Sequence, residues 1–103
     1  MKPCRATARA EADIDATIDW YLKEATADVA SRFLSVYDHA LEHIAQFPGT
    51  GSTRYAEPGD KQNLRFWLLD PFPYGVFYVE RKDFIEVVRV LHQASDIPAH
   101  LEN

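Results

Sequence analysis

The fold is decided by residues 64–92, which read LRFWLLDPFPYGVFYVERKDFIEVVRVLH. Three runs in this stretch are rich in the β-branched and aromatic residues that favour strands, at about 64–69, 75–81 and 84–92. Asp70 to Pro73 separates the first two runs, and Arg81 to Asp83 separates the last two. Because connections this short place consecutive strands side by side, the stretch predicts an antiparallel meander.

Two helical patterns precede these strands. The first begins near residues 7–10 and places apolar side chains on one stripe, at Ile14, Ile18, Tyr21, Leu22 and Ala25. The second runs from about Asp28, read as its N-cap, to Phe47, before Pro48-Gly49. Its apolar face comprises Ala30, Phe33, Leu34, Tyr37, Leu41 and Ile44. The short connection at 24–27 predicts an antiparallel hairpin that covers the sheet.

The remaining segments complete an α+β fold. Residues 3–6 can add an edge strand, although Pro3 allows pairing on one side at best. Residues 48–63 form one long loop rich in Gly and Pro. We therefore expect a single domain over 1–103, with a two-helix antiparallel hairpin packed on a three- to four-stranded antiparallel sheet.

Composition narrows the classes of function. Of the 103 residues, 47% are hydrophobic and 26% are charged, as in an ordinary globular domain, and the formal net charge is -5. That net charge argues against a direct nucleic-acid target. Cys4 is the single cysteine, so no internal disulfide is possible. The first residues lack the apolar core of a signal peptide, and we expect a cytoplasmic protein without a membrane span.

Few side chains suit acid-base or phosphate chemistry. Arg65 and Arg89 lie within strand runs, and His92 ends the last run. Each arginine either pairs with an acid, with Asp70, Glu86 and Asp96 as the candidates, or presents a cation to a partner. His92 is either a structural residue or a general base. We find no metal site, cofactor motif, phosphate loop or nucleophile elbow.

Two tryptophans are candidates for partner contacts. Trp20 falls off the apolar stripe of the first helix, with Asp13 and Thr17, so it either covers the N-terminal strand or anchors a partner. The second tryptophan, Trp67, lies in the first strand run, where successive side chains point to opposite faces of the sheet. If Leu64, Phe66 and Leu68 face the helices, then Arg65, Trp67 and Leu69 face outward and form an interaction surface.

The order and spacing of several motifs resemble the ParE side of the RelE/ParE toxin superfamily. The first helix contributes Ile14-Asp15 and Trp20-Tyr21, and the second contributes the Ala30/Phe33 and Leu41/Ile44 spacings. The remaining motifs are Phe47 to Gly51, Leu64-Arg65, Pro71 to Tyr78 and Val88 to Ile97. The resemblance extends from about Arg9 to Leu101.

The resemblance implies a helix hairpin on an antiparallel sheet and a growth-arresting toxin held inactive by a cognate antitoxin. RelE-type members cleave mRNA in the ribosome with basic side chains on the sheet, whereas ParE-type members are associated with poisoning of DNA gyrase. This sequence departs from the RNase pattern, because Gly75 stands where many RNase members carry Arg and no further Tyr follows Tyr78. Ser95 departs from the Ala-Arg-Asp common in ParE-like sequences, since a cation is missing there.

We therefore predict a ParE-like toxin without enzymatic activity that inhibits DNA gyrase and is neutralised by a ParD-like antitoxin. The alternatives are a RelE-like ribosome-dependent endoribonuclease, with Arg65, Arg89 and His92 as its catalytic set, and a non-toxic partner that modulates antitoxin DNA binding. The predicted target-binding set is Arg65, Trp67, Arg89, His92, Ser95 and Asp96. The predicted antitoxin-binding set is Trp20, Tyr21, Phe33, Tyr37 and Phe77.

Overall fold

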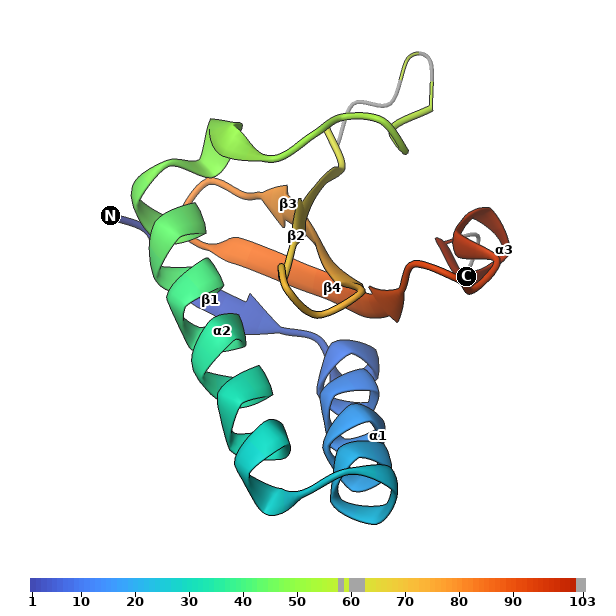
Figure 1. Cartoon of the computed structure of the whole chain (residues 1–103). Helices are drawn as coiled ribbons and strands as arrows, with labels where there is room; N and C mark the ends of the chain where they lie inside the picture. The colour runs from blue at the N-terminus through green and yellow to red at the C-terminus, as the bar shows by residue number, and fades with distance from the viewer. Residues whose placement is uncertain (58, 60–62, 102–103) are drawn as a thin grey trace.

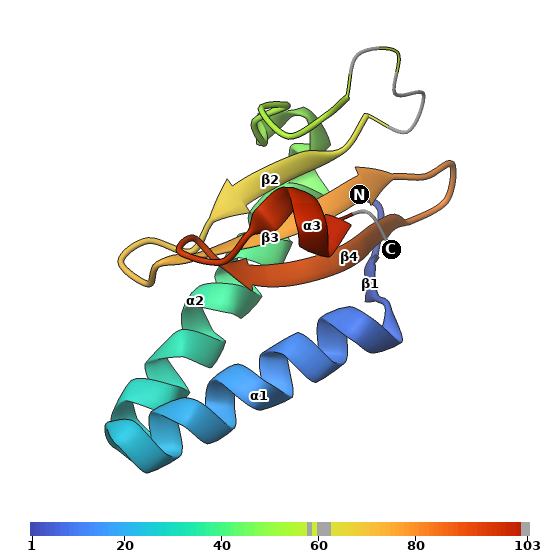
Figure 2. The ribbon, with the colours of Figure 1, turned by 90° about the vertical axis from the view of Figure 1, so that its right-hand side faces the viewer.

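The computed structural model describes residues 1–57, 59 and 63–101, and it has a helix hairpin and a short C-terminal helix on opposite faces of one sheet (Figures 1 and 2). The elements follow in the order β1 (Cys4–Ala6), α1 (Ala8–Glu24), α2 (Ala27–Gln46), η1 (Pro48–Thr50), β2 (Arg65–Leu68), β3 (Tyr74–Glu80), β4 (Ile85–His92) and α3 (Ile97–Leu101). The strand order in the sheet is β1-β4-β3-β2.

The predicted α+β fold class is confirmed. β2, β3 and β4 form the antiparallel meander, within a residue or two of the expected bounds. β1 is an edge strand with β4 as its neighbour, and it runs parallel to β4, so the four-stranded sheet is mixed. The parallel direction arises because the whole helix hairpin lies between β1 and the meander in the chain.

Threonine side chains begin both long helices. Thr7 Oγ1 accepts a hydrogen bond from the Ala10 N–H at 3.1 Å, and Thr26 Oγ1 accepts one from the Val29 N–H at 3.2 Å. The prediction of Asp28 as the N-cap of α2 was therefore wrong. Asp28 lies in the first turn, where a carboxylate interacts favourably with the helix dipole.

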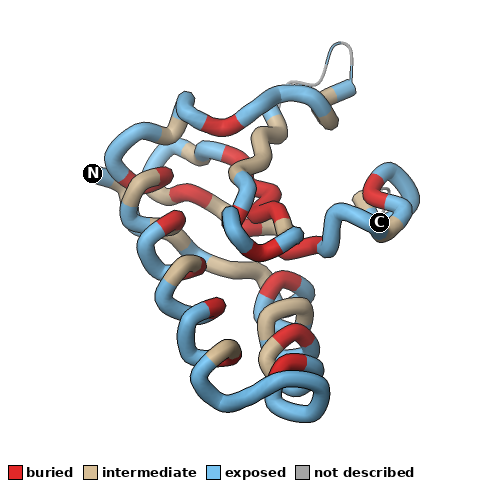
Figure 3. Tube along the Cα trace, viewed as in Figure 1, coloured by how far each residue is buried: buried red, intermediate tan, exposed pale blue. Residues whose placement is uncertain are grey.

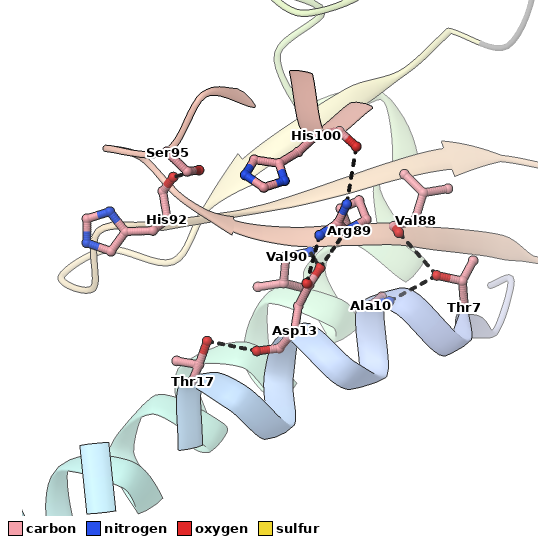
Figure 4. Close-up of polar contacts among 10 residues, drawn as sticks. All are labelled: Thr7, Ala10, Asp13, Thr17, Val88, Arg89, Val90, His92, Ser95 and His100. Carbon is pink, nitrogen blue, oxygen red and sulfur yellow. Dashed lines mark hydrogen bonds and ion pairs between the residues drawn. The ribbon is translucent and has the colours of Figure 1, made fainter. Parts of the chain in front are cut away.

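The buried face of α1 is rotated relative to the predicted stripe. Ala10, Thr17 and Tyr21 are buried, whereas Leu22, which was expected in the core, is 51% exposed. Thr17 can be buried on this face because its hydroxyl donates to the Asp13 carbonyl at 2.9 Å. The off-stripe face that carries Asp13 and Thr17 consequently points toward the sheet (Figure 4).

The two faces of β2 are the reverse of those predicted. Trp67 and Leu69 pack in the cluster beneath the hairpin, whereas Phe66 and Leu64 pack with Phe77 on the other face. The prediction failed because it assumed a single apolar layer. Ile97 of α3 builds a second apolar cluster with Phe77 and Leu91, so both sheet faces are covered over β3 and β4.

Candidate functional site

Arg89 lies at a junction of three elements (Figure 4). Its Nε donates to Asp13 Oδ2 at 2.8 Å, and its Nη2 donates to Asp13 Oδ1 at 3.0 Å. Its Nη1 donates to the His100 carbonyl of α3 at 3.2 Å. Two parallel bonds to one carboxylate are the strongest geometry available to an arginine. Arg89 therefore ties β4 to α1 and to α3.

Asp13 also closes the open part of the β4 edge. β1 stops after Ala6, and the Thr7 N–H makes the last backbone bond on that side, to the Val87 carbonyl at 2.9 Å. Beyond this point the Thr7 hydroxyl donates to the Val88 carbonyl at 3.1 Å, and the Val90 N–H donates to Asp13 Oδ2 at 2.9 Å. The start of α1 thus replaces a missing neighbour strand with side-chain oxygens.

The ion pair of Arg89 and Asp13 is largely shielded from solvent. The side chains of Arg89 and Asp13 are only 12% and 16% exposed. The hydrogen bonds that Arg89 donates to Asp13 raise the pKa of Arg89, outweighing the opposite effect of burial. Asp13, rather than Asp70, Glu86 or Asp96, is therefore the partner of this arginine. The sequence signal for it was the placement of Asp13 and Thr17 on one helical face.

The other predicted target-binding residues lie in two separate places. His92 is the last residue of β4, and Ser95 and Asp96 lie in the turn between β4 and α3. His92 and Ser95 lie away from Arg89 (Figure 4). His92 Nδ1 accepts the Ala94 N–H at 2.9 Å, and its ring packs edge-on against Tyr74 at 5.0 Å. Ser95 donates its hydroxyl to the His92 carbonyl, and Asp96 Oδ1 accepts the Ala99 N–H at 3.4 Å. These bonds describe a capped turn.

Arg65 and Trp67 lie on the hairpin face of β2, near η1. Arg65 Nη1 donates to the Gly51 carbonyl at 2.8 Å. The Trp67 ring stacks on His43 of α2 at 4.7 Å, so the expected outward position of these residues was wrong. The Tyr78 hydroxyl completes this region by donating to the Pro48 carbonyl at 2.8 Å and accepting the Gly51 N–H at 2.9 Å. Burial raises the pKa of Tyr78, so the hydroxyl stays protonated.

The structure does not assemble Arg65, Arg89 and His92 into one site. Arg65 bonds beside η1, Arg89 bonds between α1 and α3, and His92 lies in the turn after β4. Cleavage of RNA requires a base, an acid and cations around a single phosphate. Among the described residues, no group of three His, Cys, Asp or Glu side chains could hold a metal ion either.

The predicted antitoxin-binding set is mostly part of the core (Figure 3). Phe33 and Phe77 are fully buried, and Tyr21 and Tyr37 are nearly so. The structure thus places these four side chains in the core. For Tyr21, Phe33 and Tyr37, apolar helical spacing selects core residues as readily as contact residues. Trp20 is different, since it is 55% exposed while its ring still contacts Tyr21 edge-on at 5.2 Å.

Comparison with known proteins agrees with this architecture. A sequence model described as the ParE toxin of the type II toxin-antitoxin system parDE matches residues 5–97. The chain belongs to the ParE toxin family. A curated relative, Toxin ParE1 of Caulobacter vibrioides, is 29% identical over 101 residues, which cover 98% of this chain and 99% of the relative.

A solved structure described as a chromosomal ParDE TA system from P. aeruginosa shares the fold. It superposes with a TM-score of 0.73 and 21% sequence identity, covering 89% of this chain and 96% of the other. No helix in the described part of this ParE toxin is long and apolar enough to cross a membrane. This protein is thus a ParE toxin of a type II toxin-antitoxin system.

Proposed function

We propose that this ParE toxin inhibits DNA gyrase without cleaving RNA, and that a ParD-like antitoxin neutralises it. The observation that carries the proposal is the engagement of Arg89. The guanidinium of Arg89 donates to both carboxylate oxygens of Asp13 and to the His100 carbonyl. Its charge is therefore balanced by a carboxylate, which makes it a poor cation for a transition-state phosphate. A gyrase target also implies that the protein acts in the cytoplasm.

The charge of the chain supports the same proposal. A net charge of -5 opposes the approach of a polyphosphate, whereas a protein target imposes no such requirement. Of the predicted target-binding residues, His92 at the end of β4 and Asp96 in the turn that follows it are exposed. We propose this turn as the part of that set that contacts the target, because it offers polar groups on a surface loop.

The antitoxin is proposed to dock on the outside of the helix hairpin. α1 and α2 leave three large apolar side chains exposed, namely Trp20, Leu22 and Leu34. Trp20 and Leu22 lie on opposite sides of the buried Tyr21 around α1, about 200° apart, so one docked helix covers one of the two sides. We propose that an antitoxin segment folds as an amphipathic helix over the side that carries Trp20, a mode common for disordered partners. Trp20 is the expected anchor, since tryptophan is enriched among residues that dominate binding energy.

Purified toxin can decide the target directly. We expect the protein released from its antitoxin to inhibit supercoiling by DNA gyrase, and the intact toxin–antitoxin complex to serve as the inactive control. In growth-arrested cells, primer extension should show little mRNA cleavage. Codon-phased cuts in translated messages, together with unimpaired supercoiling, would overturn the proposal in favour of the RelE-like alternative. Unimpaired supercoiling together with uncut mRNA would favour the alternative of a non-toxic partner.

A further inference from the structure

The outer edge of β2 is only partly covered. The Ser52 N–H donates to the Phe66 carbonyl and the Phe66 N–H donates to the Ser52 carbonyl, both at 2.9 Å, in a single antiparallel bridge. Along an antiparallel strand, alternate residues direct their backbone groups to the same side. Leu68 therefore directs its N–H and C=O outward as Phe66 does, while Leu69 donates inward to the Tyr74 carbonyl at 2.9 Å.

A hollow opens where this bridge ends. The chain before Ser52 turns into η1 instead of continuing beside β2, so it leaves the strand after one bridge. The resulting hollow is about 380 Å³ and is lined by Thr50, Ser52, Phe66, Trp67, Leu68 and Asp70. This is the volume of roughly a dozen water molecules, which leaves room for a large side chain. Leu68 at its border is 44% exposed.

Aromatic side chains and one carboxylate, that of Asp70, surround the hollow. Trp67 stacks on His43, and His43 lies 5.4 Å from the ring of Phe47, which is 58% exposed. Asp70 is exposed and forms no ion pair with any of the residues that the structure describes. The partly exposed Phe66 and Trp67 that line the hollow and the unpaired carboxylate beside them are complementary to an apolar anchor with a neighbouring cation.

We propose that the β2 edge binds an extended segment of the antitoxin, which pairs with Leu68, inserts an apolar side chain into the hollow and directs a Lys or Arg toward Asp70. The Ser52 bridge supports an extended occupant, since the same edge already accepts one backbone segment. The inference rests on the proposed neutralisation by an antitoxin, and it adds a second contact surface. The α1–α2 turn lies at the end of α2 that is farther from η1 (Figure 1).

The other edge of the sheet is less suited to such a partner. β1 is preceded by Pro3, which has no N–H to donate. Lys2 beside it pairs with Glu80 at 2.8 Å, and Arg5 within it lies over the Phe84 ring at 5.2 Å. Proline and charged side chains at an edge strand discourage added strands. The four-residue β2 carries neither feature at Leu68.

Amide exchange in the complex with the full-length cognate antitoxin tests the edge without any mutation. We expect the Leu68 amide, which has no strand partner among the described residues of the free toxin, to become protected on binding. Protection of α1 and α2 without protection of Leu68 would overturn this inference and leave the proposed hairpin docking intact. If neither the hairpin nor Leu68 becomes protected, both proposed docking sites for the antitoxin are wrong.

Variants sharpen the test. Leu68→Pro removes the outward N–H while the bonds to β3 remain, and Leu68→Ala keeps the N–H but removes the side chain. We expect Leu68→Pro to weaken antitoxin binding by at least about tenfold, and by more than Leu68→Ala. Asp70→Lys should also weaken binding, while Asp83→Lys, the same charge change on another exposed acid, should not. Unchanged affinity in Leu68→Pro and Asp70→Lys, with melting curves that show folded proteins, would contradict the inference.

Discussion

The two edges of the sheet satisfy their backbone hydrogen bonds in different ways. Past the end of β1, the edge of β4 is closed by Asp13, whose carboxylate binds both the Val90 N–H and the Arg89 guanidinium. Past the Ser52 bridge, the edge of β2 is left open beside a hollow and the exposed Leu68. We refer to the first as the fastened edge and to the second as the open edge.

The comparison shows that residue type alone does not separate structural from functional positions. The fastened edge carries an arginine that suggested a binding cation, yet its hydrogen bonds hold α1, β4 and α3 together. The open edge carries Leu68, which suggested a core residue, yet it borders the recess. What decides the role is whether the surrounding backbone has already satisfied its hydrogen bonds.

The largest effect is expected at the fastened edge. Asp13→Ala or Arg89→Ala should each lower the free energy of unfolding by about 3 kcal/mol, because each leaves a mostly buried charge without its partner. A double-mutant cycle measured by chemical denaturation gives the coupling energy of the pair.

The matched control for this cycle is the pair of Arg81 and Glu86. Its contact is equally short, at 2.7 Å, but the side chains are more exposed. Exposed pairs contribute about 0–1 kcal/mol, so its coupling energy should be small. A coupling energy for Asp13 and Arg89 no larger than this control would show that the fastened edge does not depend on the ion pair.

A smaller effect is expected at η1 and Gly51, the segment that lies beside the open edge. Tyr78→Phe removes the hydroxyl that joins Pro48 and Gly51 to β3, and should cost about 1–2 kcal/mol. It should also speed exchange of the Gly51 amide. Tyr55→Phe is the control, because no hydrogen bond of the Tyr55 hydroxyl to the described residues is present. Unchanged exchange at Gly51 would show that Tyr78 does not hold η1.

Tyr78 and Phe66 approach Gly51 so closely that this position requires a glycine. A Cβ at this position would overlap the Tyr78 hydroxyl and lie 2.9 Å from the Phe66 carbonyl oxygen. Both groups are fixed by hydrogen bonds, so neither can move away without loss. The conformation at Gly51 itself is ordinary extended backbone, with φ at -72°. The requirement is one of space.

Local sequence patterns were sufficient for the two long helices and the strands, but not for η1, for α3 or for the faces that the elements bury. Strand and helix bounds follow from alternation and helical periodicity, which neighbouring residues encode. The faces of β2 depended on α3, whose five residues gave no strong signal, yet whose Ile97 buries Phe77 and Leu91. Without that second layer, the alternation Phe66-Trp67 can be read in either direction.

The contacts that define the edges were beyond the reach of local patterns. Asp13 and Arg89 are 76 residues apart, and only the parallel pairing of β1 with β4 brings α1 to that position. The open edge depends on where the chain before Ser52 leaves β2, which is a property of tertiary packing. The family motifs indicated the class of protein without showing which residues are free to bind.

The smallest effect is expected at the turn between β4 and α3. Ser95 replaces the cation common in ParE-like sequences, and both its N–H and its hydroxyl donate to the His92 carbonyl. If a cation here contacts the target, Ser95→Arg should increase gyrase inhibition. We expect instead equal inhibition and a stability change within about 0.5 kcal/mol, because the N–H of Ser95 can keep the turn and exposed substitutions seldom cost more.

Supercoiling assays at matched concentration, with melting curves for each protein, compare Ser95→Arg with the wild type. Ser95→Ala is the control that removes the hydroxyl bond without adding charge. Equal inhibition by all three proteins would assign Ser95 to the turn alone. Stronger inhibition by Ser95→Arg only would place the turn at the target interface, and would show that the missing cation limits the potency of this toxin.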